Sequence, residues 1–81
     1  MDDTEILARV GALVDEEHRL RESAQRGDLA PERERARLAE LEVALDQCWD
    51  LLRQRRARRD AGADPDRAGV RPPDEVEGYQ Q

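Results

Sequence analysis

The sequence predicts an all-α protein: an antiparallel two-helix hairpin of the coiled-coil type, followed by an irregular C-terminal tail. Two observations support this prediction. Apolar side chains recur every three or four residues in two segments, and a short connection from Gly27 to Pro31 separates the segments. Apolar residues at this spacing line one side of an α-helix, which then needs a partner helix to cover them. A connection this short favours antiparallel packing of the two helices.

The first helix is expected over residues 3–26. Asp2, with Glu5 three residues later, fits a capping box, and Gly27 fits a C-terminal stop. The apolar stripe of this helix comprises Ile6, Val10, Leu13, Leu20 and Ala24, with Glu17 in one stripe position and Leu7 and Val14 beside it.

The second helix is expected over residues 31–60, so that the hairpin occupies residues 1–61. Pro31 suits the first turn of a helix, where its missing N–H costs little, and the helix ends before Gly62. The apolar stripe of this helix comprises Leu38, Leu41, Leu45, Cys48 and Leu52, with Trp49 and Leu51 on either side of it.

Matching the two stripes gives an approximate register for the antiparallel pair. It places Leu13 beside Leu45 and, further along, Asp3 near Arg55. The Arg-rich end of the second helix then lies next to the acidic N-terminus of the first helix, which neutralises part of its charge.

Residues 62–81 form an acidic tail that we expect to be either flexible or docked. Its prolines and glycines prevent a continuous helix, and disorder is the default for such a composition. The second possibility is that Val76 and Tyr79 dock into a groove of the hairpin.

The side chains beside the two stripes form a candidate protein interface. A lone hairpin of this size has little interior, so these side chains stay partly exposed in a monomer. We expect them to be covered by dimerisation into a four-helix bundle or by another protein. The candidate interface residues are Leu7, Val14, Trp49 and Leu51.

Composition restricts the classes of function. The net charge of −6 does not favour nucleic-acid binding, which depends on neutralising phosphates. The single cysteine, Cys48, excludes an internal disulfide and fits a reducing compartment. The acidic start does not resemble a signal peptide, and the longest run of low polarity, residues 10–14, is far shorter than the ~20 residues of a membrane span. We therefore expect a cytoplasmic protein that does not enter a membrane.

An Arg-rich end of the second helix is the candidate anion site. Arginine side chains match phosphate oxygens, so this end could bind a nucleotide, RNA or another anion. The simpler interpretation is a solvated helix end compensated by Asp2, Asp3 and the helix dipole. The candidate anion-binding residues are Arg53, Arg55, Arg56, Arg58 and Arg59.

No cofactor, metal or catalytic site is predicted. Glu17, His18 and Glu42 are the only residues that suggest a metal site, but the inward Glu-x-x-His arrangement is not met, and Glu17 is expected to pair with Arg21 or Arg37. Cys48 lies in the stripe, where packing as a small hydrophobe is favoured over reactivity. There is no Ser/His/Asp set and no glycine-rich phosphate loop.

The segment from Leu41 to Arg56 (LEVALDQCWDLLRQRR) resembles the hallmark of an actinobacterial family, domain of unknown function 2630. The stretches Asp3–Leu7, Glu16–Leu20 and Val70–Tyr79 are also similar, so the resemblance covers nearly the whole chain. It implies a coiled-coil hairpin from a bacterial cytoplasm and supplies no activity.

A looser likeness is to actinobacterial anti-sigma factors, which are antiparallel hairpins that bind a cyclic dinucleotide through Glu, Ser, Arg, Gln and Asp. Counting from Glu42 with the residue spacing of those factors reaches Asp46, Trp49, Arg53 and Ala57. These differ from the Ser, Arg, Gln and Asp that those factors carry, so the binding pattern is not met. Only the architecture carries over.

The function expected from the sequence is a non-enzymatic interaction or structural module that dimerises or docks onto a partner protein. The alternative is an anion-, nucleotide- or RNA-responsive regulator that uses the Arg-rich end. A third interpretation is a metal-dependent enzyme centred on Glu17 and His18.

Overall fold

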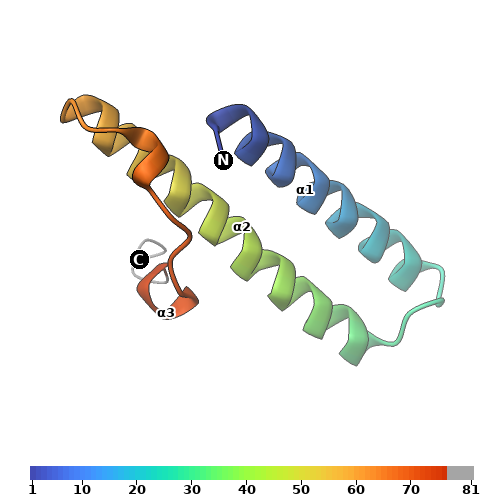
Figure 1. Cartoon of the computed structure of the whole chain (residues 1–81). Coiled ribbons are helices and arrows are strands. Elements are labelled where there is room, and N and C mark those ends of the chain that lie inside the picture. The colour runs from blue at the N-terminus through green and yellow to red at the C-terminus, as the bar shows by residue number, and fades with distance from the viewer. Residues whose placement is uncertain (77–81) are drawn as a thin grey trace.

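A computed structural model describes residues 1–76 and shows a helical hairpin with a tail that returns along it. The two long helices are α1 (Asp3–Gln25) and α2 (Pro31–Asp60), and they lie side by side and antiparallel (Figure 1). A short 3-10 helix, η1 (Pro65–Arg67), and a single helical turn, α3 (Pro73–Val76), follow. The described part of the chain contains no strand. The all-helical prediction is confirmed, and α1 ends one residue earlier than expected.

Local sequence explains where the helices begin and end. The Asp2 carboxylate accepts a hydrogen bond from the backbone N–H of Glu5 at 2.8 Å, which caps α1. Gly27 and Gly62, each one residue beyond a helix C-cap, have positive φ angles of 79° and 73°. In both places the following residue donates its N–H back to a carbonyl five residues earlier, which completes a Schellman motif.

The apolar core lies between the two long helices and is narrow. Ile6, Val10 and Leu13 of α1 are buried, as are Leu41 and Leu51 of α2. The other members of the α2 stripe are only half-buried. Two helices alone cannot surround a side chain, so the core needs a further layer.

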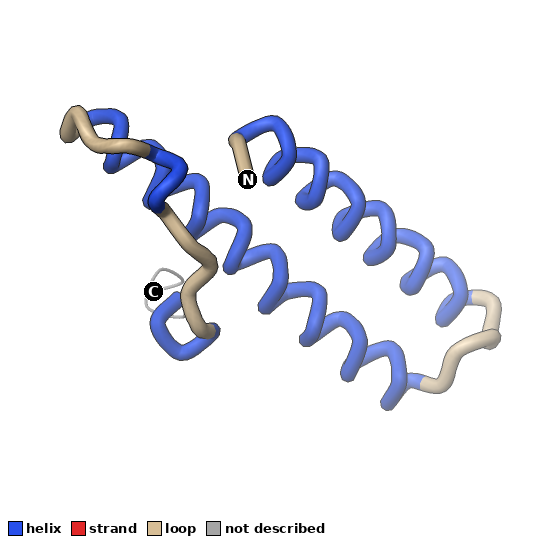
Figure 2. The backbone as a smooth tube through the Cα atoms, in the orientation of Figure 1, coloured by secondary structure: helices blue, strands red, loops and turns tan. Residues whose placement is uncertain are grey.

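The tail supplies part of that layer. After Gly62 the chain reverses direction, η1 packs against the C-terminal part of α2, and α3 packs against its middle (Figure 2). Val76 of α3 is only 2% exposed. Tyr79, the other apolar side chain expected to dock, lies outside the described residues.

The long helices are too polar to be membrane spans. Within residues 1–76, no helix has a stretch long and apolar enough to cross a bilayer.

Candidate protein-interaction surface

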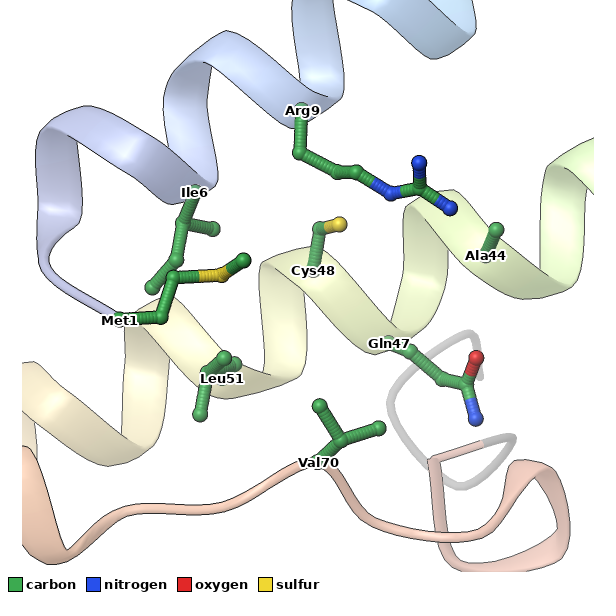
Figure 3. A pocket seen from close by; sticks show the side chains of 8 residues that line it. All are labelled: Met1, Ile6, Arg9, Ala44, Gln47, Cys48, Leu51 and Val70. Atoms are coloured by element: carbon green, nitrogen blue, oxygen red, sulfur yellow. The ribbon is translucent and has the colours of Figure 1, made fainter.

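The tail covers one side of the hairpin and thereby changes the candidate interface. Leu51 is only 5% exposed, so the expectation that it stays partly exposed in a monomer is wrong. Leu51 lies on the side of α2 along which the tail returns, with Ile6 of α1 and Val70 of the tail nearby. Leu51 and Val70 line the same cavity of about 220 Å³, together with Ile6 and Cys48 (Figure 3).

A set of polar side chains on α2 holds the tail in this position. We call Gln47, Asp50 and Gln54, together with Arg71 of the tail, the tail clamp. The Asp50 carboxylate has no exposed surface and accepts two hydrogen bonds from the guanidinium of Arg71, one of them from Nε at 2.9 Å. Gln54 donates through Nε2 to Asp50 at 2.9 Å and to the Gly69 carbonyl at 2.8 Å. Gln47 donates to the Arg71 carbonyl at 3.1 Å.

Sequence reasoning missed the role of this clamp. Gln47, Asp50 and Gln54 stand at spacings of three and four, so they share one side of α2, but a polar set at that spacing normally marks a solvated face. The one signal that points to the clamp is Arg71, a cation in a mostly acidic tail, which directly precedes the Pro72-Pro73 pair.

The Arg-rich end is largely used inside the molecule. Arg55 is 5% exposed; its Nε donates to Asp3 at 2.5 Å, and its Nη1 donates to Asp66 at 2.9 Å. Arg59 also binds Asp3, at 2.9 Å. The expected proximity of Asp3 and Arg55 is therefore confirmed. These contacts join α1, α2 and η1, so the two arginines serve the fold.

The other three arginines of this end differ in burial, with Arg53 and Arg56 exposed and Arg58 half-buried.

These ion pairs shift the pKa values of the groups involved. Hydrogen bonds from Arg59 and then Arg55 hold the pKa of the Asp3 carboxyl below its ordinary value. The carboxylates of Asp3 and Asp66 raise the pKa of Arg55. Both shifts have a structural cause, so neither indicates a catalytic group.

Cys48 and the Glu17–His18 pair are placed as follows. Cys48 is half-buried, and burial raises the pKa of its thiol, although the charge of Arg9 acts in the opposite direction.

His18 is exposed, and Glu17 lies 3.9 Å from Arg21. Arg37 instead pairs with Glu16 at 2.5 Å. Within residues 1–76, no three acidic, histidine or cysteine side chains converge as metal ligands would.

The side of the hairpin away from the tail keeps its apolar side chains exposed. Leu7 is 52% exposed, Val14 36% and Trp49 44%. An open groove of about 370 Å³ runs between the helices here and is lined by Trp49 and Leu45, with Glu17 of α1 across from them. We call the surface formed by Leu7, Val14, Leu45 and Trp49 the open face.

Helical geometry places Leu7 and Val14 on this side. Each follows a buried stripe residue by one position and therefore lies about 100° around α1 from the core. Glu17, three residues after Val14, lines the groove beside Trp49. Arg9, on the other side of α1, lines the cavity next to the tail (Figure 3). The tail and the open face are thus on opposite sides of the hairpin.

Fold and surface together define a small helical hairpin protein with a clamped C-terminal tail. The chain belongs to the family described as Protein of unknown function (DUF2630), whose model matches residues 2–81. It is similar to uncharacterized proteins of Mycobacterium bovis and Mycobacterium tuberculosis, each 52% identical over 77 residues, which cover 95% of this chain and 88% of the relative. The family resemblance seen in the sequence is therefore confirmed. No solved structure matches the chain.

Proposed function

We propose that this protein is a non-enzymatic protein–protein interaction module that acts through the open face. The observation that carries the proposal is the asymmetry of the hairpin. The tail clamp holds the tail along one side of α2, whereas Leu7, Val14 and Trp49 stay exposed on the side that the tail does not cover. Single exposed apolar residues are normal, but a contiguous apolar group rimmed by charges is typical of a protein-binding site.

The residue types on this face support the same proposal. Tryptophan is enriched among the side chains that contribute most to binding between proteins. Trp49 lies next to an open groove whose other walls include Glu17, Glu42 and Asp46. Apolar side chains surrounded by carboxylates resemble the centre and rim of a protein interface.

The buried polar groups of the described residues also favour a binding module over an enzyme. Asp50 and Arg55 are the buried charged side chains, and each is held by partners from another element. They are occupied in joining the tail and η1 to α2. Their burial is therefore explained by the architecture.

A capture experiment with a matched control tests this proposal. Val14 on the open face and Val43 on the other side of the hairpin have nearly equal exposures of 36% and 38%. Tagged wild-type protein, Val14→Ser, Trp49→Ala and Val43→Ser would be purified from a mycobacterial host under gentle conditions. We expect one protein to be retained stoichiometrically by the wild type and by Val43→Ser, and to be lost from Val14→Ser and Trp49→Ala.

Two outcomes would contradict the proposal. One is equal retention of every protein by all four forms, which would remove the role of the open face. The other is co-purification of nucleotide or RNA in place of a protein, which would favour an anion-responsive regulator.

A further inference from the structure

We propose that the partner at the open face is a second copy of this chain, bound antiparallel about a two-fold axis beside Trp49. This inference rests on the proposed function and identifies the partner. It is carried by the distribution of charge along α2, which is complementary to itself only in that orientation.

Three residues on one side of α2 define the pattern. Glu42, Trp49 and Arg56 are spaced by seven residues, which is two turns of helix, so they lie in a row with about 10 Å between neighbours. All three are exposed. Within residues 1–76, neither Glu42 nor Arg56 forms an ion pair. The row therefore has a free negative end, an aromatic centre and a free positive end.

An antiparallel contact between two α2 helices matches these ends. When the two-fold axis passes beside Trp49, residues at equal distances before and after Trp49 face each other. Glu42 of each copy then faces Arg56 of the other copy, which gives two ion pairs for one contact. Charged residues flanking an apolar contact are the feature that sets orientation in coiled coils.

The other way of joining two open faces gives a worse match. In this arrangement the two-fold axis runs parallel to the helices. It would place α1 of one copy on α2 of the other, with residues at the same height along the hairpin facing each other. Glu17 and Glu42 already line one groove within the hairpin. That orientation would bring two such grooves together and place four carboxylates at one level, which is unfavourable.

The apolar part of the open face is centred near the same axis. The ion pair between Asp3 and Arg55 fixes the register of α1 against α2. In this register Leu7 lies at the level of Leu51 and Val14 at the level of Ala44, on either side of Trp49. Turning a second copy about this axis therefore brings the two Trp49 side chains together at the centre and places the Glu42–Arg56 pairs on either side of them, as expected for an interface between identical subunits.

Charge reversal at the two ends of the row tests the proposal. Glu42→Arg and Arg56→Glu would be compared with the wild type and the double variant by analytical ultracentrifugation at low ionic strength. We expect a wild-type dimer, and each single reversal should raise its dissociation constant by about tenfold because like charges then face each other twice. The double variant should dimerise like the wild type. Circular dichroism would verify that every variant keeps its helices.

Mixing the two single variants adds a more selective measurement. A Glu42→Arg chain has two arginines at these positions, and an Arg56→Glu chain has two glutamates. In the antiparallel register each arginine of the first chain faces a glutamate of the second, so the equimolar mixture should form heterodimers tighter than either homodimer.

The outcomes separate this inference from the proposed function. A wild-type monomer at millimolar concentration would refute self-association, while capture of another protein through Val14 and Trp49 would still support the interaction module. A wild-type dimer that is unaffected by the single reversals, or is not restored in the double variant and the mixture, would refute the antiparallel register.

Discussion

At the scale of single residues, Asp50 is the residue on which the tail depends most. It is fully buried and accepts hydrogen bonds from Arg71 and Gln54, so the tail contributes directly to compensating its charge. Buried ion pairs of this kind contribute little net stability compared with apolar packing, but removing one member leaves the other charge without its partner.

The first prediction concerns this carboxylate. Asp50→Asn keeps the volume of the side chain but replaces one acceptor oxygen with a donor that faces other donors, so the free energy of unfolding should fall by about 2–3 kcal/mol. Asp60→Asn, at an exposed aspartate in the same helix, should change it by less than about 0.5 kcal/mol. Urea unfolding followed by circular dichroism measures both, and equal effects would contradict the assigned role of Asp50.

The second prediction concerns Asp3 and pH. Because Arg59 and Arg55 lower the pKa of Asp3 in the folded state, its contribution to stability is present above its ordinary pKa of 3.8. This contribution is lost as the pH falls through the lower, folded-state pKa. Wild-type protein should therefore melt at a higher temperature than Asp3→Asn at pH 6, and the difference should shrink progressively below about pH 4. A difference that stays constant from about pH 6 to about pH 2.5 would contradict the pairing.

At the scale of secondary-structure elements, the ends of α1 and α2 follow from local sequence. The capping carboxylate of Asp2, Pro31 in the first turn of α2 and the glycines beyond both C-termini all act within a few residues of the boundary they set. For this reason the predicted helices and the observed helices differ by a single residue.

The third prediction uses two glycines that should respond in opposite directions. Gly27 has a φ of 79°, which is strained for any residue with a Cβ, so Gly27→Ala should lower the free energy of unfolding by about 1 kcal/mol. Gly11 lies inside α1, and a Cβ added to it would meet nothing within 4 Å, so Gly11→Ala should raise the free energy of unfolding by roughly 0.5–1 kcal/mol. Thermal melting of both variants compares the signs. Destabilisation by Gly11→Ala would contradict the exposed position of this residue on the hairpin.

At the scale of the whole molecule, the tail acts as a third layer for a hairpin that is too thin to form a core. The Cα atoms span 51 Å in length but only 16 Å in the thinnest direction, so nearly every residue lies close to the surface. Val76 and the tail clamp cover one side of α2, and Leu7, Val14 and Trp49 stay exposed on the opposite side.

The fourth prediction concerns truncation. A chain ending at Ala68 keeps the ion pair between Arg55 and Asp66 but loses Arg71 and Val76. Its free energy of unfolding should be lower by about 3 kcal/mol, because Leu51 becomes exposed and the Asp50 pair is lost. In this shortened chain Asp50→Asn should have little further effect, since the carboxylate is then hydrated. Additive effects in this double-mutant cycle would show that Asp50 does not act through the tail.

Part of the candidate interaction surface could be predicted from the sequence. Leu7, Val14 and Trp49 are exposed as the spacing of the stripes indicates, because a residue one position from the stripe lies about 100° away from it. Leu51 has the same relation to the α2 stripe and is nevertheless buried. The difference arises because Leu51 precedes a stripe residue whereas Trp49 follows one, so Leu51 lies on the other side of the stripe, where the returning tail and Val70, 19 residues later in the chain, line a cavity with it.

The sequence by itself determined the two helices, their boundaries, their antiparallel register and the family. These properties depend on apolar periodicity, capping groups and chain connectivity, all of which act over short distances along the chain. Only the tertiary structure decided which side of the hairpin the tail covers. That choice depends on the pairing of Asp50 with Arg71, 21 residues apart, and on hydrogen bonds from Gln47 and Gln54 to the tail backbone. Such contacts leave no periodic trace in the sequence, so the separation of a sealed side from an open face appears only in the folded molecule.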